Sequence, residues 1–366
     1  MKKLISDTFT RLGEDGSVFP AQGLLARAIG VAALLCAAPA CVHAQGSVTL
    51  YGILDAGIQY RTHADGTNSE INLQNYGNIP SLVGMSGKEE LGGGLSAVFK
   101  LEQGLNLNDG TPTVPGYAFF RGAYVGLSGP FGTATIGRQT TVLFDQNLYF
   151  DPLLLSAYSA DGEVIPVTDN FVSNAVKFKS ASLGGIELEA LAATGGIAGR
   201  STSGRVLELG VQFSGTSLGA SGVIRESYGT YVSDADDTSG LKRVIATLAA
   251  NYHIGGFTAY AGFERQTGDL APVKTVLWTG ARYQIFSDLS FAGGVYQTLS
   301  NTPSVGNPTL YSFSMTYNLS KRTSTYLNAA YSRNSSQSSQ TVYEYDPTLL
   351  NGVGQLGVML GITHTF

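Results

Sequence analysis

The chain ends on the stretch QLGVMLGITHTF, residues 355–366. Its bulky side chains occupy every second position: Leu356, Val358, Leu360, Ile362, His364 and Phe366. The positions between them carry Gln355, Gly357, Met359, Gly361, Thr363 and Thr365. A period of two is typical of a β-strand whose faces meet two different environments. Because the bulky face continues to the last residue, we expect the C-terminus to belong to a packed strand.

The same alternation recurs throughout the chain. Within residues 47–60, Leu50 and Ile58 share one face, whereas Asp55 and Gln59 share the other. About sixteen such segments can be placed, each near the ten residues that a tilted membrane-crossing strand needs. Their expected starts are Ser47, Ser81, Gly94, Ala118, Gly132, Phe171, Gly185, Gly204, Gly219, Lys242, Gly256, Val273, Asp288, Thr309, Thr323 and Gln355.

The connectors alternate between short and long. Tight turns such as SGPFG, SASLGG and NLSKR are followed by longer polar links such as RTHADGTNSEINLQNYGN and YVSDADDTSG. Outer-membrane barrels have this asymmetry, with short periplasmic turns and longer external loops. We find no repeat of fixed length and no linker, so a propeller, a solenoid or a second folded domain is not expected.

Composition favours strands and turns over helices. Charged residues make up 13% of the 366 positions, Gly is frequent at 47, and Tyr and Phe (19 and 17) outnumber the single Trp. Typical soluble domains contain roughly 25% charged residues. No apolar run of about 18 residues follows the N-terminal region, which argues against a helical membrane protein.

Residues 1–44 are predicted to be a secretory signal. Arg27 precedes a short apolar stretch, and Val42-His43-Ala44 forms a small-x-small cleavage site. We interpret the long segment before Gly23 as the result of a start codon assigned too early, and a lipid-anchored Cys41 is an alternative to cleavage after Ala44. Both cysteines, Cys36 and Cys41, would be removed with the signal, which leaves residues 45–366 as one thiol-free domain.

The mature chain is acidic. Removing four of the 22 basic and three of the 27 acidic side chains leaves 18 and 24, a net charge near −6. A strongly basic nucleic-acid surface is therefore excluded.

These features predict an all-β protein, a transmembrane antiparallel β-barrel. Alternation alone does not say which face points outward, but an export signal and many strands of about ten residues favour apolar side chains facing lipid. Closure of the sheet then pairs every backbone group, as a bilayer demands. With about sixteen strands the lumen is too wide for side chains to fill and holds water. The polar face carries Asp55, Lys100 and Glu102.

Six stretches together resemble the Gram-negative general porins of the β-proteobacterial and neisserial type. They are SVTLYGILDAGI, GKEELGGGLSAVFKLEQGLN, FFRGAYVGLSGPFGTATIGRQ, NAVKFKS, YNLSKRTSTYL and the terminal GITHTF. The resemblance covers essentially the whole mature chain. It implies a homotrimer in the outer membrane, in contact with the bilayer and lipopolysaccharide. Each barrel would be an aqueous pore for ions and small hydrophilic solutes, narrowed by an inward-folded third external loop.

The loop that the resemblance places in the lumen is residues 139–170. It contains no Lys or Arg, and its acids are Asp145, Asp151, Asp161, Glu163 and Asp169. Opposed charges in a narrow passage set ion selectivity. We expect two or three of these acids to face the constriction, while the others are solvated or bind the loop's own backbone.

Basic residues of the opposite wall are candidates for the other half of the constriction. Arg121 and Arg138 match the family's pore-lining positions. We assign Arg121 to the inward face with Ala123 and Val125, whereas the parity of Arg138 is ambiguous and it could instead anchor the loop. Lys177 and Lys179 alternate with apolar neighbours and so point inward, where they could also pair with Glu187 and Glu189 on the next strand.

One departure from the family pattern bears on selectivity. Relatives usually read Ser-Arg-x-Gly-x-Arg/Lys-Gly after the first external loop, but this chain reads SLVGMSG, with Leu82 and Ser86 at the basic positions. We therefore expect an anion preference weaker than is usual for the family, or a slight cation preference.

Other chemistries find little support. The histidines His43, His63, His253 and His364 fit no catalytic triad or metal motif, so we expect no enzyme activity, no cofactor and no metal site. A substrate-specific channel for a sugar or an organic or aromatic acid is the alternative function, because several tyrosines lie in the external loops. A non-conducting barrel is a third possibility. By resemblance, a terminal aromatic strand ending on Phe366 is the signal that the outer-membrane insertion machinery recognises.

Overall fold

The computed structural model describes residues 46–159, 170–303, 305–343 and 349–366. They form one 17-stranded antiparallel sheet, the helix α2 (Val142–Phe150) and the short 3-10 helix η2 (Asp234–Asp236). The strands are β1 (Ser47–Arg61), β2 (Glu70–Gln74), β3 (Leu82–Gly92), β4 (Leu95–Gly104), β5 (Gly122–Gly129), β6 (Gly132–Thr140), β7 (Phe171–Ser180), β8 (Ile186–Ala193), β9 (Val206–Ser214), β10 (Leu218–Tyr228), β11 (Lys242–Ile254), β12 (Phe257–Gly268), β13 (Lys274–Gln284), β14 (Leu289–Leu299), β15 (Thr309–Asn318), β16 (Thr323–Arg333) and β17 (Gln355–Thr365). No helix in this part of the chain is long and apolar enough to cross a membrane.

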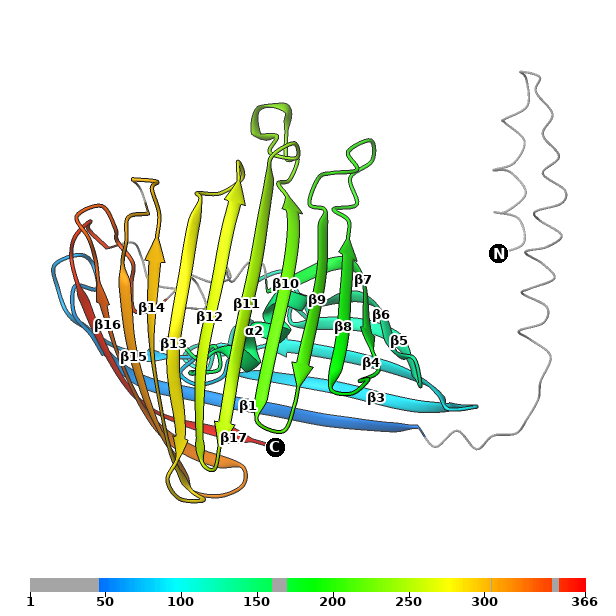
Figure 1. Ribbon diagram of the computed structural model, residues 1–366, viewed down its shortest axis with the longest axis horizontal. Helices are drawn as coiled ribbons and strands as arrows, with labels where there is room; N and C mark the ends of the chain where they lie inside the picture. The colour runs from blue at the N-terminus through cyan, green and yellow to red at the C-terminus, as the bar shows by residue number, and fades with distance from the viewer. Residues whose placement is uncertain (1–45, 160–169, 304, 344–348) are drawn as a thin grey trace, which may run out of the picture. The chain divides into compact units, whose positions relative to one another are not determined.

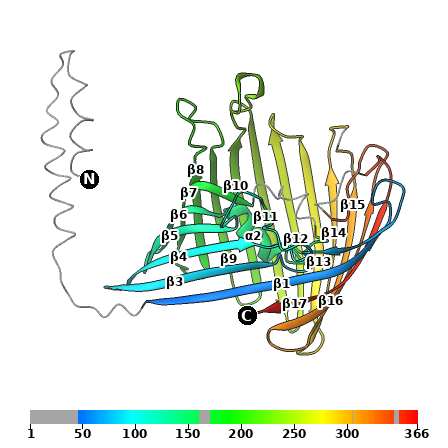
Figure 2. The same ribbon diagram turned by 180° about the vertical axis from the view of Figure 1, so that it is seen from behind.

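The sheet closes into a barrel with sixteen strand positions, one of which is shared by two strands. Neighbouring strands pair in sequence order from β3 to β17, and β17 pairs with β1. On its other edge, β1 pairs with β3 through Ser47–Ile53 and with β2 through Gly57–Arg61. β2 and β3 therefore occupy the same strand position in the barrel. The sixteen-strand antiparallel prediction is confirmed, and Figures 1 and 2 show the strands running side by side around the barrel.

Strand β2 was missed, because it lies within the stretch that the sequence suggested as one long loop. Its residues EINLQ nevertheless alternate, and Ile71 and Leu73 are exposed on the outer face. A strand of five residues is too short for a period of two to stand out against polar neighbours.

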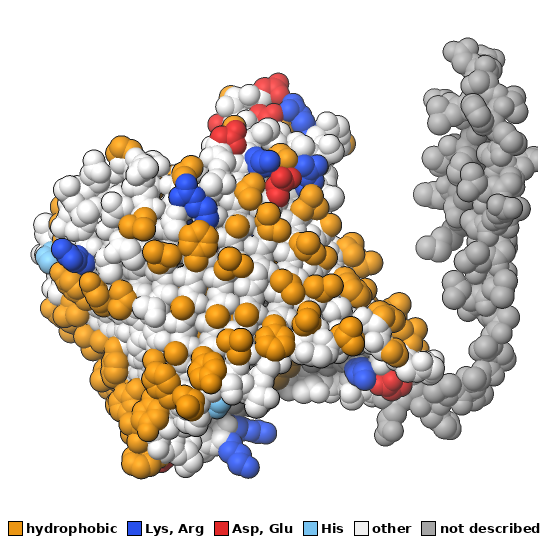
Figure 3. Space-filling model, in the orientation of Figure 1, with side chains coloured by type: hydrophobic (Ala, Val, Ile, Leu, Met, Phe, Trp, Pro, Cys, Tyr) orange, Lys and Arg blue, Asp and Glu red, His pale blue; other side chains and the backbone are white. Residues whose placement is uncertain are grey.

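Apolar side chains cover the outside of the barrel. On β17, Leu360 is 63% exposed, whereas Met359 beside it is fully buried. The same outward exposure is found at Leu50, Val125, Ile136, Leu188, Leu209, Ile224 and Leu248. A water-soluble protein rarely exposes apolar surface on this scale, so this face is the one that contacts lipid. Figure 3 shows hydrophobic side chains spread over the wall, with charged ones gathered toward the two rims.

The seam between the first and last strands extends to the final residue. The backbone N–H of Phe366 donates to the carbonyl of Gly52 at 3.1 Å, and the N–H of Gly52 donates to the carbonyl of Phe366 at 3.2 Å. The Phe366 ring covers Gly52 so closely that a Cβ there would lie 2.3 Å from a ring carbon. β17 and β1 lie side by side in Figure 2, and their pairing leaves no sheet edge open at the seam.

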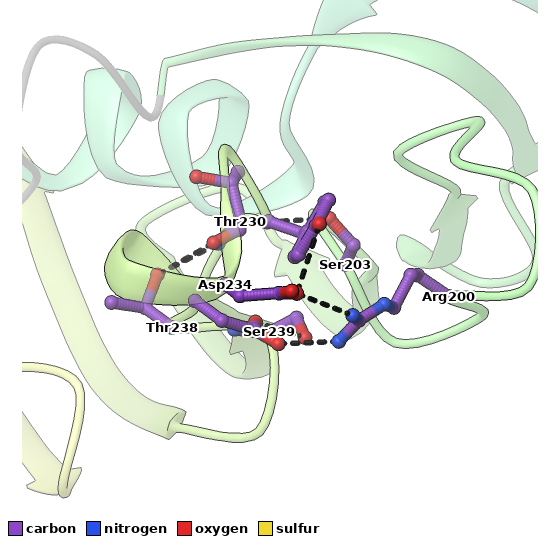
Figure 4. A network of polar contacts seen from close by, with 8 residues as sticks. Arg200, Ser203, Thr230, Asp234, Thr238 and Ser239 are labelled. Atoms are coloured by element: carbon purple, nitrogen blue, oxygen red, sulfur yellow. Dashed lines mark hydrogen bonds and ion pairs between the residues drawn. The ribbon is translucent and has the colours of Figure 1, made fainter.

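The two ends of the barrel differ in their connections. Residues 93–94, 130–131, 181–185, 215–217, 255–256, 285–288 and 319–322 close one end with short turns. Connections at the opposite end include 105–121, 141–170, 194–205, 229–241 and 334–354. Two of these links are tied together by Arg200, which pairs with Asp234 and Asp237 at 3.3 and 2.5 Å and stacks on Tyr231 (Figure 4).

Candidate functional site

A cavity of about 1080 Å³ occupies the barrel interior. Among the described residues, its charged lining consists of three arginines, Arg61, Arg121 and Arg282, with no Asp or Glu. Small hydroxyl residues of β14 to β17 line one side, and apolar residues of α2 and the turn after it line another. The charged part of the cavity lining is thus cationic, whereas most of the lining area is apolar.

Helix α2 packs against the inner face of strands β8 to β12. Its first turn is capped by Thr141, whose hydroxyl accepts from the N–H of Phe144 at 3.2 Å. A carboxylate of the barrel wall, Glu208, accepts from the N–H of Val142 at 2.6 Å and pairs with Arg225 at 3.1 Å. A negative group at a helix N-terminus satisfies orphan N–H groups and complements the helix dipole. The wall therefore fixes where this helix begins.

The chain after α2 continues along the inner wall. Trp278 of β13 donates its indole N–H to the carbonyl of Phe150 at 3.0 Å, and Ser312 of β15 donates to the carbonyl of Tyr158 at 2.5 Å. Gln59 of β1 donates to the Tyr158 hydroxyl at 2.8 Å. The segment is therefore bonded to β13, β15 and β1 in turn.

A glycine makes room for the Trp278 anchor. The Trp278 ring lies over Gly262 of the neighbouring strand, where a Cβ would come within 1.9 Å of ring carbons. Only a residue without a side chain allows this close approach. The indole is thereby buried against the wall with its N–H directed at the loop backbone.

Asp151 organises the turn that follows α2. Its carboxylate accepts from the N–H groups of Leu153 and Leu155, at 3.0 and 2.7 Å, and from the Tyr296 hydroxyl. Burial raises the pKa of Asp151 to about 6. Asp151 is therefore an internal anchor and does not line the cavity.

The same turn holds two leucines in the left-handed region. Leu154 and Leu155 have φ of 54° and 52°. This conformation costs roughly 1–2 kcal/mol for each residue with a Cβ. The bonds to Asp151 stabilise it, and as a result Leu154 stays 39% exposed among the cavity-lining residues.

Asp55 is also an anchor. It is fully buried, and its carboxylate accepts from the N–H of Gly77 at 2.7 Å, from the Tyr326 hydroxyl at 2.9 Å and from the Thr363 hydroxyl at 2.5 Å. It thus holds the start of the segment 77–81 against β16 and β17, and it does not line the cavity.

Glu102 is the centre of a charged cluster that includes Arg121. It contacts Lys100 at 2.8 Å, Arg121 at 3.0 Å and the Tyr51 hydroxyl at 2.7 Å. The parity assigned to Arg121 was wrong, because Val125 is 60% exposed on the outer face. Arg121 precedes the first residue of β5, so strand alternation does not set its direction, and its side chain reaches inward to Glu102.

Arg138 lies at a bulge between Gly137 and Gln139. Its guanidinium donates to the Phe120 carbonyl at 2.5 Å and to Ser173 at 2.8 Å, and it stacks on the rings of Tyr117 and Phe120. It is not among the cavity-lining residues. These contacts are those of a residue that ties neighbouring loop ends together.

Lys177 and Lys179 point to the inner face and pair locally. Lys177 forms an ion pair with Asp145 of α2 and lies 3.9 Å from Glu189. Lys179 contacts Glu189 at 2.8 Å and Glu187 at 3.1 Å. Each lysine is thus neutralised by neighbouring carboxylates.

The two positions where the chain departs from its family face inward. Leu82 is buried, and Ser86 stands directly opposite Lys100 on β4. Asp161, Glu163, Asp169 and the predicted signal in residues 1–44 lie outside the described residues. Within the described ranges, no group of three or more His, Cys, Asp or Glu side chains could hold a metal ion.

Several residues of the site were not singled out from the sequence. Arg282 and Trp278 lie four residues apart in β13 and both point inward, so the alternation of this strand could have identified them. Arg61 is the last inward-facing residue of β1. The exposure of Leu154 had no sequence signal, because its backbone conformation depends on the contacts of Asp151.

Comparisons with known proteins agree on one family. A family model described as Gram-negative porin matches residues 30–337. Outer membrane porin protein 32 of Delftia acidovorans is 27% identical over 359 residues, which cover 92% of this chain and 99% of the relative. Major outer membrane protein P.IB of Neisseria gonorrhoeae is 41% identical over 117 residues, about a third of each protein (31% and 32%).

The anion-selective porin from Comamonas acidovorans superimposes with a TM-score of 0.76 at 24% identity, covering 88% of this chain and all of that one (100%). This likeness concerns the fold. Together with the closed barrel, its apolar outer face and its interior cavity, the matches identify the chain as a member of the Gram-negative porin family, a β-barrel channel of the outer membrane.

Proposed function

We propose that this porin is a passive diffusion channel for ions and small hydrophilic solutes, with a modest preference for anions. The supporting observation is the cavity, whose described lining carries Arg61, Arg121 and Arg282 and no carboxylate. A fixed positive charge raises the local concentration of anions and lowers that of cations in a confined aqueous passage.

Two of these arginines are ion-paired, Arg61 with Glu70 at 2.5 Å and Arg121 with Glu102 at 3.0 Å, so the net positive charge of the described lining comes from Arg282. Asp145 and Glu102 are ion-paired, and Asp55 and Asp151 are buried and saturated with hydrogen bonds. Paired or buried carboxylates project little net field into the lumen. This arrangement supports an anion preference in spite of the missing bases at Leu82 and Ser86, and the loss of those bases keeps the preference modest.

Several further properties belong to the same proposal. Residues 1–44 act as an export signal, and Phe366 with its strand is recognised by the insertion machinery. The barrel assembles as a homotrimer in contact with lipopolysaccharide, and the segment that follows β6 forms the constriction. The contacts of α2 with the inner wall support the last of these.

Planar-bilayer recording tests the proposal. Purified protein should give stepwise conductance, and the reversal potential in a potassium chloride gradient should give a chloride-to-potassium permeability ratio above one. Arg282→Gln should lower that ratio. Absence of conductance steps, or a preference for potassium in the unaltered protein, would contradict the proposal.

A further inference from the structure

The apolar side of the cavity is not needed for passage of small hydrophilic solutes. Tyr149 and Leu154 are 58% and 39% exposed, and both line the cavity. Leu154 is held there in a left-handed backbone conformation that side chains rarely adopt. Strained non-glycine residues with an exposed apolar side chain point to a contact surface for a ligand.

A guanidinium lies next to this surface. Arg282 of β13 donates to the carbonyl of Pro152 at 3.4 Å, two residues before Leu154. It makes no ion pair with any residue in the described part of the chain, whereas Arg121 is paired with Glu102 at 3.0 Å and Arg61 with Glu70 at 2.5 Å. Arg282 is therefore the cavity arginine whose charge is available to a solute.

Space is open beside Arg282. Arg282 is paired across the strands with Ala292 on β14, which in turn is paired with Ser314 on β15. The neighbouring inward-facing pair on the same two strands is Ser290 on β14 and Thr316 on β15. Small side chains leave room for a ligand, and the serine and threonine hydroxyls can donate to an oxyanion.

We propose that the cavity contains a binding site for carboxylates with an apolar body, in which Arg282 binds the carboxylate and Leu154 packs against the hydrocarbon part. A guanidinium binds a carboxylate through two parallel hydrogen bonds, which a neutral alcohol cannot replace. The hydrocarbon part removes Leu154 surface from water, which a bare acetate ion cannot do. The site rests on the diffusion-channel proposal, and it names a solute class that the channel would retain while others pass.

The chain offers an optical probe of this site. Trp278 is the single tryptophan of the sequence and lies on the inner face of β13, as Arg282 does. Its fluorescence can be followed in purified, folded protein in detergent micelles during titration with cyclohexanecarboxylate, which does not absorb in the tryptophan range. Two control compounds separate the contributions: acetate has the carboxylate without the cyclohexane ring, and cyclohexylmethanol has the ring without the negative charge.

We expect a saturable fluorescence change with cyclohexanecarboxylate only. Arg282→Gln should weaken binding by about tenfold or more, and Leu154→Ser by roughly fivefold. Arg282→Lys should retain part of the affinity. The control variants Arg265→Gln and Leu241→Ser, which alter an arginine and a leucine outside the cavity lining, should bind within about twofold of the parent protein.

The same variants in planar bilayers separate the two proposals. Cyclohexanecarboxylate should reduce single-channel current in the parent protein at concentrations that leave Arg282→Gln unaffected. Equal titration curves for the parent and Arg282→Gln, or equal effects of acetate and cyclohexanecarboxylate, would overturn the binding site even with normal conductance. Saturable binding without conductance steps would support the site and overturn the diffusion channel.

Discussion

Replacing Glu102 by Gln removes one negative charge from the inner wall with little change in shape. Tyr51 and Arg121 donate to different carboxylate oxygens of Glu102, so the single carbonyl oxygen of Gln can keep one of these two hydrogen bonds. The ion pair with Lys100 is lost, and the positive charges of Lys100 and Arg121 are no longer balanced. Because Arg121 lines the cavity, the imbalance acts on permeating ions.

The size of the effect follows from Coulomb's law. One unit charge acting on a monovalent ion at about 5 Å in water is worth about 0.8 kcal/mol. That energy corresponds to about a fourfold change in local ion concentration, and dissolved salt reduces it. We therefore expect Glu102→Gln to raise the chloride-to-potassium permeability ratio about two- to fourfold.

Reversal potentials in a potassium chloride gradient measure this ratio directly. The matched control is Glu226→Gln, since Glu226 also faces two basic residues, Arg205 at 3.6 Å and Lys242 at 3.3 Å, but is not among the cavity-lining residues. The control should leave the ratio within experimental error of the parent value. An unchanged or lower ratio in Glu102→Gln, or an equal shift in both variants, would refute the reasoning.

Three other perturbations test the anchors and the seam. Gly262→Val places side-chain atoms where the Trp278 ring lies and should lower the free energy of unfolding by about 1–3 kcal/mol and make single-channel current noisier; a quiet channel of parental stability would contradict this. Because the pKa of Asp151 is raised from 3.8 to about 6, the free energy of unfolding in urea should fall as pH rises from about 4 to 6, by up to about 3 kcal/mol, and Asp151→Asn should remove that fall. An identical pH profile in Asp151→Asn would show that another group is responsible. Deleting Phe366, which pairs with Gly52, should lower the yield of assembled barrel in cells while leaving the conductance of assembled channels unchanged; normal yield would count against its role in assembly.

The alternation of side chains predicted much of the fold correctly because each strand residue has only two directions to point. Leu360 and Met359 are adjacent in sequence, yet one faces lipid and the other is buried. That difference is visible in the letters QLGVMLGITHTF alone. The strand β2 escaped notice because five residues carry too few alternations.

The site was less predictable because the alternation of side-chain direction holds only within a strand. Arg121, one residue before β5, turns inward although Val125 on the same parity faces out. Asp151 and Asp55 are acidic and were therefore expected to line the pore. Both are instead buried, where their carboxylates accept hydrogen bonds from backbone N–H groups. These partners lie far away in the sequence.

The sequence by itself determined the class of fold and the closure of the barrel by its last strand, since these depend on local periodicity and on the polarity of each residue. The export signal and the many strands of about ten residues indicated that the apolar face meets lipid. Only the tertiary structure decided which charges remain available in the lumen. That outcome depends on long-range pairing, which neutralises Lys177 with Asp145, leaves Arg282 without an ion pair among the described residues and holds Leu154 exposed beside it.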